Sequence, residues 1–189
     1  MPSSKTWCAS CSNKSRRSRF RAIESQTGKV LAVIDLAVSE IINLLQRYDL
    51  CLVISDDAAP IPGTYWGEPE AGIIGHTIYA RSDTPIHSLL HETCHVICMP
   101  GQRRDSLCRD AGGDDLEESA VCYLQVLLAD CLQNVGRKRL MRDMDAWGYS
   151  FRLGNTRQWF EQDAEDARQF LLKHNLITES GAPSFSLRA

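Results

Sequence analysis

The sequence predicts an α+β fold in which a small sheet in the N-terminal half is followed by a mostly helical half. Short runs rich in β-branched residues, at 51–54 and 73–81, are typical of strands. Beyond residue 84, apolar side chains recur at three- and four-residue steps, which is the period of amphipathic helices. With 189 residues, 43% of them hydrophobic and 24% charged, the chain is long enough to bury one sizeable core.

Composition divides the chain into three segments. Residues 1–22 carry six Lys or Arg and no acidic residue. We therefore expect residues 1–28 to form a disordered basic tail, residues 29–175 a single domain, and residues 176–189 a loose C-terminal tail. Cys8 and Cys11 have the spacing of half a zinc ribbon, but no second C-x-x-C completes it, so they are interpreted as incidental thiols.

Charge and cysteine usage exclude several classes of function. The net charge of −3 becomes −9 when the six basic residues of the first segment are set aside, and so acidic a body argues against nucleic acid as a partner. Eight Cys are too few for a small secreted disulfide scaffold, so we expect reduced thiols in a cytoplasmic protein. No apolar stretch reaches the ~18–20 residues of a membrane span, and no membrane association is expected.

The elements expected before residue 84 are one helix and the strands. Residues 30–48 have the apolar spacing of an amphipathic helix, 51–54 form a strand, and the Pro- and Gly-rich residues 56–72 form a loop. The strand region 73–81 is interrupted at Gly75. At a sheet edge it would accept an extended peptide through main-chain hydrogen bonds, and in the sheet interior it would not; both positions remain open.

The remaining elements are helices. The first, over 84–99, begins with Thr84 as N-cap and Pro85 in the first turn, and it ends at Pro100. Further amphipathic patterns follow, separated by Gly-containing turns, over 114–133, 136–148 and 155–171.

The first of these helices carries His91-Glu92-Thr93-Cys94-His95, an H-E-x-x-H. Residues four apart lie on one face of a helix, so His91 and His95 can direct two imidazoles at one Zn²⁺ ion. A catalytic zinc site needs a third protein ligand and keeps its fourth position for water. Glu92 lies about 100° round the helix from His91, where its carboxylate can reach that water as general base.

Two adjacent carboxylates on the next helix compete for the third position. With Leu116 taken as the buried direction, Glu117 lies about 100° away, at the edge of the apolar face, and Glu118 about 200° away, beside Gln125 on the polar face. We therefore predict Glu117 as the third ligand. The alternative is that Glu117 completes a capping box with Asp114.

These residues carry a family resemblance. Residues 84–128 resemble the active-site core of the zincin metallopeptidases, specifically the gluzincins, whose third zinc ligand is a Glu on the following helix. Glu117-Glu118-Ser119-Ala120 is similar to the Glu-x-x-Ala pattern of ImmA/IrrE-type peptidases. The resemblance implies a zincin-like fold, a Zn²⁺ cofactor held by His91, His95 and Glu117, Glu92 as catalytic base, and a peptide or protein substrate. It also implies an oxyanion-stabilising Tyr or His, for which Tyr149 is the candidate.

A second function uses the same centre without catalysis. A catalytically silent zinc-binding domain would bind a partner, or would sense zinc or redox state through Cys94 and Cys98, which share the histidine face of the helix. One metal cannot easily span His91 to Cys98, which lie roughly 10 Å apart along the axis. Both thiols are therefore interpreted as small apolar fillers, and His87 as an ordinary residue of the first turn.

Overall fold

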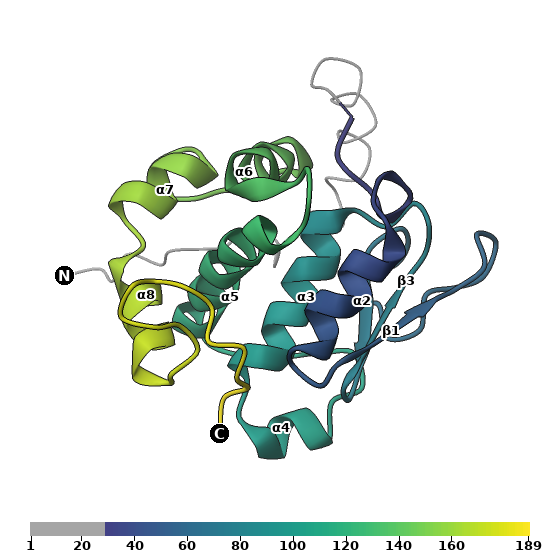
Figure 1. Ribbon diagram of the computed structural model, residues 1–189, viewed down its shortest axis with the longest axis horizontal. Coiled ribbons are helices and arrows are strands. Elements are labelled where there is room, and N and C mark those ends of the chain that lie inside the picture. The colour runs from purple at the N-terminus through teal and green to yellow at the C-terminus, as the bar shows by residue number, and fades with distance from the viewer. Residues whose placement is uncertain (1–28) are drawn as a thin grey trace.

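The computed structural model of the chain describes residues 29–189 and has the α+β class that the sequence predicts. Predictions for residues 1–28, including Cys8 and Cys11, lie outside this range. The elements follow in the order of a short 3-10 turn, one helix, three strands and the remaining helices (Figure 1). Their bounds are Val33–Asp35 (3-10 turn), α2 Val38–Gln46, β1 Cys51–Ile54, β2 Gly72–Ile74, β3 Thr77–Ala80, α3 Ile86–Cys98, α4 Gly101–Asp105, α5 Asp115–Leu128, a 3-10 turn Ala129–Cys131, α6 Gly136–Trp147, α7 Thr156–Gln162 and α8 Glu165–Lys173.

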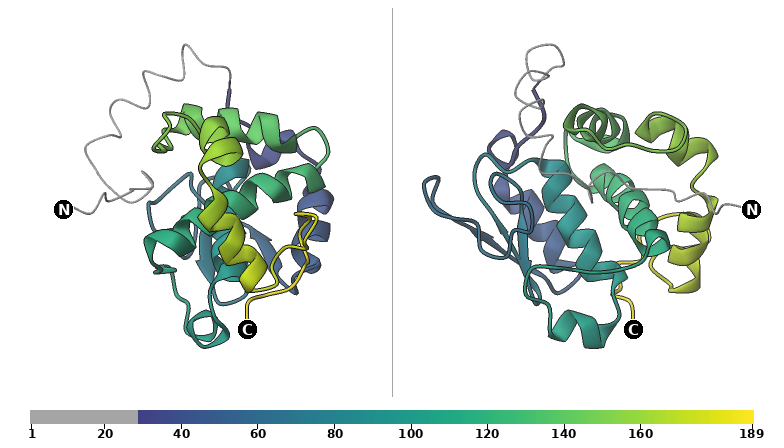
Figure 2. Two further views of the ribbon diagram at one scale, coloured as in Figure 1. Left: turned by 90° about the vertical axis from the view of Figure 1, so that its left-hand side faces the viewer. Right: turned by 180° about the vertical axis from the view of Figure 1, so that it is seen from behind.

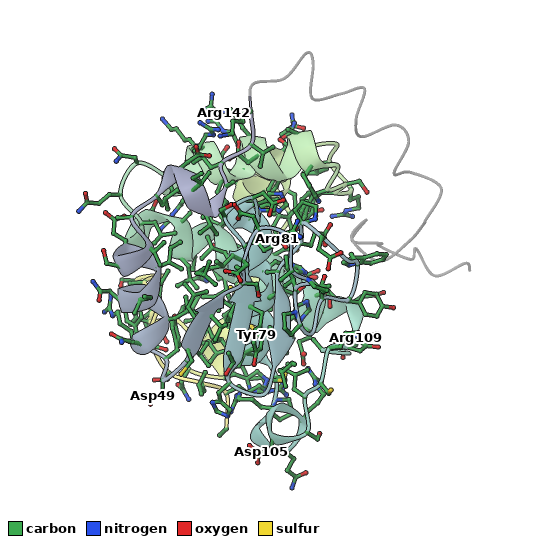
Figure 3. All side chains as sticks on the ribbon, turned by 90° about the vertical axis from the view of Figure 1, so that its right-hand side faces the viewer. Asp49, Tyr79, Arg81, Asp105, Arg109 and Arg142 are labelled. Atoms are coloured by element: carbon green, nitrogen blue, oxygen red, sulfur yellow. The ribbon has the colours of Figure 1, made fainter. Side chains whose placement is uncertain are left out.

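The sheet has the strand order β1-β3-β2. β1 pairs with β3 in parallel, with Cys51 opposite Thr77, while β2 and β3 form an antiparallel hairpin that turns at Gly75. The predicted strand region 73–81 is thus two strands: β3, which leads into α3, is central, whereas β2 lies at an edge of the sheet. Figure 3 views the molecule from the side of the sheet and labels Tyr79 on β3.

Helix α3 lies between the sheet and α5, and every residue of Ile86–Cys98 is buried (Figures 1 and 2). Burial on all sides explains why the helix carries apolar residues round its whole circumference. Its C-terminal carbonyl groups are not left unpaired, because Arg104 donates to the carbonyl oxygens of Val96 (2.8 Å) and Met99 (2.7 Å). A histidine pair on this helix is thereby held in the most constrained element of the fold.

Three helices differ from their predicted lengths. The helix predicted over 114–133 ends at Leu128 and continues only as the 3-10 turn Ala129–Cys131. The pattern over 30–48 is a helix only over Val38–Gln46, because the preceding backbone is used in tertiary hydrogen bonds: Val33 N–H donates to the Thr84 carbonyl and Ile34 N–H to that of Ser82. The last predicted helix is divided into α7 and α8, and Asp163 at the break forms an ion pair with Arg152. Periodicity alone does not report such interruptions.

The C-terminal segment corrects a prediction. Residues 176–189 are not a loose tail: Leu176 and Ile177 are buried, and the Phe185 ring lies 5.4 Å from the Tyr48 ring. Arg188 N–H donates to the Ile97 carbonyl, and the Arg188 guanidinium donates to the Cys98 carbonyl (3.1 Å) and to Glu117 Oε2 (3.0 Å). The segment therefore ties the C-terminal end of α3 to α5.

We expect Arg188→Met to lower thermal stability, because the buried Glu117 carboxylate and the Cys98 carbonyl each lose a charged donor. The free energy of unfolding should fall by about 1–3 kcal/mol, measured by chemical denaturation. Arg157→Met is the matched control, since it removes only the exposed ion pair with Glu161 and should cost less than about 0.5 kcal/mol. Equal stability of the parent and Arg188→Met would mean that the segment does not contribute to the fold as its contacts indicate.

Within residues 29–189, no helix combines the length and the apolar character needed to cross a membrane.

Candidate metal centre

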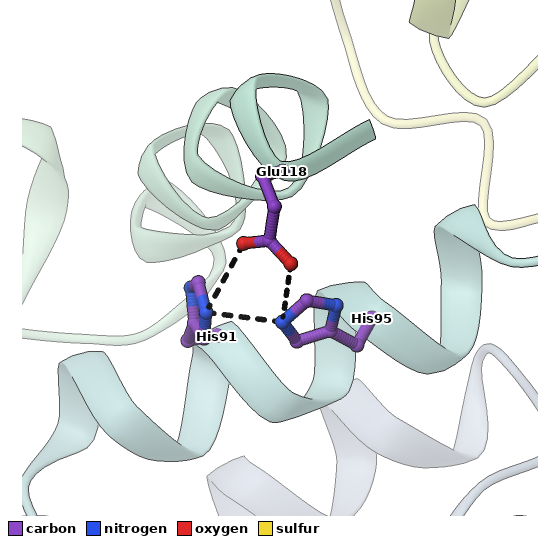
Figure 4. Close-up of side chains that lie close together, drawn as sticks. All are labelled: His91, His95 and Glu118. Atoms are coloured by element: carbon purple, nitrogen blue, oxygen red, sulfur yellow. Dashed lines mark hydrogen bonds and ion pairs between the residues drawn. The ribbon is translucent and has the colours of Figure 1, made fainter. Parts of the chain in front are cut away.

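The two histidines of the H-E-x-x-H meet on one face of α3. His91 and His95 are separated by one turn, and their Nε2 atoms lie 3.1 Å apart (Figure 4). The two rings are nearly perpendicular, with centroids 4.6 Å apart. This is the convergence that the spacing predicts.

The third group is the carboxylate of Glu118, on the first turn of α5 (Figure 4). Glu118 Oε1 lies 3.5 Å from His95 Nε2, and Oε2 lies 3.9 Å from His91 Nε2. One ligand atom from each of the three residues falls within 4.8 Å of the others, and among the described residues this is the group of metal-ligating side chains with that geometry.

Glu117 lies elsewhere, which corrects the predicted third ligand. Its carboxylate pairs with Arg103 and with Arg188, and its N–H donates to Asp114 Oδ1 (2.8 Å). Asp114 thus caps the helix, which is the part of the capping-box alternative that concerns Asp114. The error lies in the reference direction: Leu116 is 41% exposed, so it does not mark the face of α5 that turns toward α3.

The three ligand atoms lie close to the separations that a tetrahedral ion requires. Zinc binds imidazole nitrogen and carboxylate oxygen at roughly 2.0–2.2 Å, so tetrahedral ligand atoms lie about 3.3 Å from one another. The two histidine Nε2 atoms, 3.1 Å apart, lie close to this value. The distances of 3.5 and 3.9 Å end on different oxygens of Glu118, and with one ligand atom per residue all three atoms lie within 4.8 Å of one another. Two nitrogens and one oxygen are also a donor set that suits Zn²⁺. The residues present therefore fit the ion.

Gln125 orients His91 from behind. Its Oε1 lies 2.8 Å from His91 Nδ1, and the Gln125 side chain is fully buried. If the amide oxygen accepts from Nδ1–H, the lone pair of His91 is on Nε2, the atom that faces His95 and Glu118. Gln125 comes two turns after Glu118 on α5, so one helix supplies both the acidic group and the residue that fixes the His91 tautomer.

We expect Gln125→Leu to weaken zinc binding by about 10- to 100-fold, because loss of the acceptor frees the ring orientation and tautomer of His91. Competition with a chromophoric chelator measures the dissociation constant. Gln133→Leu, an exposed glutamine just beyond the same helix, is the control and should match the parent. Unchanged zinc affinity in Gln125→Leu would contradict this role.

Burial favours the metal-binding state of both histidines. His91 and His95 are 7% and 6% exposed. Desolvation lowers the pKa of His91 to about 4, although the hydrogen bond with Gln125 opposes that shift. Desolvation also holds the pKa of His95 well below its usual range, with further lowering from His91 and Arg103. Both rings are therefore neutral near pH 7, and each has one nitrogen with a lone pair that can bind a metal ion.

Glu92 lies in the same buried region and is 8% exposed. Burial raises its pKa well above the ordinary value, and the carboxylates of Glu70 and Glu118 raise it further. A cation held by the histidines and Glu118 would act in the opposite direction and favour the ionised form. The ionisation of Glu92 is thus coupled to occupation of the neighbouring centre.

Tyr149 follows α6 and borders the histidine face of α3. Its ring centroid lies 5.9 Å from that of His91 and 5.6 Å from that of His87, in both cases edge to face. His87 itself is 1% exposed and lies 5.0 Å from the Trp147 ring. The family resemblance alone made Tyr149 a candidate for oxyanion stabilisation, and the sequence analysis interpreted His87 as an ordinary residue of the first turn.

No protein-family model, curated protein or solved structure matches the chain. The class that fold and site define is an α+β protein with two histidines of one helix and a carboxylate of a second helix gathered into a candidate metal centre.

Proposed function

We propose that this protein is a zinc-dependent peptidase of the gluzincin type. The observation that carries the proposal is the convergence of His91 Nε2, His95 Nε2 and the Glu118 carboxylate, with Glu92 next to His91 on the same helix. Helix α3 would correspond to the active-site helix of a zincin-like fold, and α5 would supply the third ligand.

A Zn²⁺ ion held by His91, His95 and Glu118 would act as a Lewis acid toward water and toward a substrate carbonyl. Glu92 would accept a proton from the attacking water and deliver it to the leaving amide nitrogen. Gln125 would keep His91 in the ligating tautomer, while Tyr149 would face the reacting carbonyl from the side of α6 and stabilise its developing negative charge.

The cysteines support a reducing compartment for this activity, and we place the protein in the cytoplasm. All six cysteines among the described residues are free, including the exposed Cys51, Cys108 and Cys131. Proteins of oxidising compartments tend to pair such thiols.

The alternative function, a zinc-binding domain without catalysis that senses redox state through Cys94 and Cys98, has less support. Cys94 and Cys98 are fully buried in the hydrophobic core, and burial raises the pKa of both thiols. A sensing cysteine needs an accessible thiolate, which neither residue offers.

Zinc analysis and peptide cleavage together test the proposal. The purified full-length chain should hold one equivalent of zinc and should cleave members of a peptide library, with new N-termini identified by mass spectrometry. Removal of the metal with a chelator should abolish cleavage, and added zinc should restore it. Absence of zinc, or cleavage that survives its removal, would refute the proposal.

A further inference from the structure

His87 on α3 differs from the other histidines of that helix in that both of its ring nitrogens are buried without a partner in the part of the chain that the structure describes, whereas His95 leaves only Nδ1 so and His91 neither. Both ring nitrogens of His87 lie without a hydrogen-bond partner among the described residues, and the side chain is 1% exposed. Buried polar atoms in folded proteins almost always have a partner, and leaving one without is costly. Both nitrogens of this imidazole are therefore available to a polar group that comes into contact with it.

The neighbours of His87 place it beside the candidate metal centre. It precedes His91 by one helical turn, at which spacing Cβ atoms lie about 5–6 Å apart. The Tyr149 ring touches His87 and His91 alike, with centroid distances of 5.6 and 5.9 Å. A continuous group of three rings, His87, Tyr149 and His91, therefore extends from the candidate metal centre toward α6.

The surrounding aromatic residues do not account for the histidine. Trp147 covers one side of the His87 ring at 5.0 Å, but the Trp147 N–H is directed to Glu70 Oε1 (3.2 Å). A phenylalanine at this position would make the same ring contacts without burying two nitrogens. Aromatic contact alone would therefore favour Phe over His here.

We propose that His87 is a substrate-contacting residue that donates a ring N–H to the carbonyl oxygen of an acyl substrate. The inference rests on the proposed peptidase function and extends it by a second hydrogen-bonding group beside Tyr149. Burial lowers the pKa of His87 to about 3, so the ring is neutral and carries one N–H donor and one acceptor nitrogen. A fixed donor in a dry site is suited to stabilise negative charge that develops on a carbonyl oxygen. Because the Trp147–Tyr149 turn covers His87, substrate binding requires that this turn move aside.

Binding of acetohydroxamate to the zinc-loaded full-length protein tests the inference without requiring a known substrate. The carbonyl oxygen of this small zinc-binding compound stands in for that of a peptide. His87→Phe should retain one equivalent of zinc and should melt at or above the temperature of the parent, because two unpartnered nitrogens are removed. Its acetohydroxamate affinity, measured by calorimetry, should fall about fivefold or more through loss of one hydrogen bond.

Two further variants complete the comparison. His87→Gln keeps an N–H donor and should recover part of the lost affinity, whereas His76→Phe replaces an exposed histidine of the β2–β3 turn and should match the parent. If Phe prevents folding, the smaller His87→Leu takes its place. Unchanged affinity in the donor-free variant, or no binding of the compound to the zinc-loaded parent, would overturn the role of His87.

These results separate the two proposals. A parent that retains no zinc refutes the peptidase function and the role of His87 together. A parent that binds zinc and acetohydroxamate but cleaves no peptide refutes the peptidase function alone, and the variant comparison still decides whether His87 contacts the ligand.

Discussion

Glu118→Gln should strip the protein of zinc, whereas Glu117→Gln should leave zinc bound. The Glu118 carboxylate is the group that faces both histidine Nε2 atoms, and two imidazoles alone do not complete a three-ligand site. Loss of a residue that only orients a ligand already costs about 10- to 100-fold in metal affinity, so loss of the ligand itself should exceed about 100-fold. The measurement is zinc retained after dialysis against a weak chelator.

The matched change at Glu117 should have a different effect. Its buried carboxylate pairs with Arg103 and Arg188, so the amide variant leaves two guanidinium groups without their anion. The free energy of unfolding should fall by about 2 kcal/mol, while the zinc content stays at that of the parent. The reverse pattern, with zinc lost from Glu117→Gln and kept in Glu118→Gln, would show that Glu117 is the ligand after all.

The sequence predicted that Glu117 would face the two histidines, whereas in the structure Glu118 does. This difference shows what a sequence can predict about a site. His91 and His95 lie one turn apart on one helix with Glu92 beside His91, so the convergence of the two imidazoles is predictable from helical spacing alone. The third group, Glu118, comes from a second helix, and whether it or Glu117 faces the histidines depends on how α5 is rotated about its axis relative to α3. The prediction oriented α5 by assuming that Leu116 points into the core. Leu116 is 41% exposed in the structure, so that orientation was wrong.

The polar face of α5, rather than its apolar face, indicates which side of the helix faces the two histidines. Glu118 and Gln125 share a face that amphipathic reasoning assigns to solvent, yet Gln125 is fully buried and contacts His91. A metal centre reverses the usual pattern because its ligands and their supporting groups must be polar and buried at once. The seven-residue spacing from Glu118 to Gln125, two turns of one helix, is the signal in the sequence that this face also serves a site.

The same reasoning explains the errors at the ends of the domain. The strand at 51–54, the loop before β2 and the C-terminal end of α3 follow from local patterns, and the structure confirms them. The predicted N-cap of α3 is wrong, because Pro85 holds that position and the Thr84 hydroxyl accepts from the Arg81 N–H. The role of residues 176–189 does not, because it depends on the long-range contacts of Arg188 with α3 and Glu117. Long-range hydrogen bonds likewise shorten the predicted 30–48 helix.

Glu92→Gln should retain zinc and lose peptide hydrolysis by at least about 100-fold, because an amide preserves the shape of the side chain but cannot accept a proton from water. Since Glu92 is not among the three converging groups, the zinc content should equal that of the parent. This combination of full metal content and absent cleavage distinguishes loss of the base from loss of the site. The variants are compared on one cleaved peptide at saturating zinc.

Glu70→Gln is the matched control, because it also removes one negative charge close to Glu92 while keeping an acceptor for the Trp147 N–H. If Glu92 acts only through its charge, the two variants should lose similar amounts of activity. If it acts as the base, hydrolysis by Glu70→Gln should stay within about tenfold of the parent and only Glu92→Gln should fail. A Glu92→Gln protein as active as the parent would rule out the proposed mechanism, since none of the other groups placed at the centre combines a free carboxylate with a position beside His91.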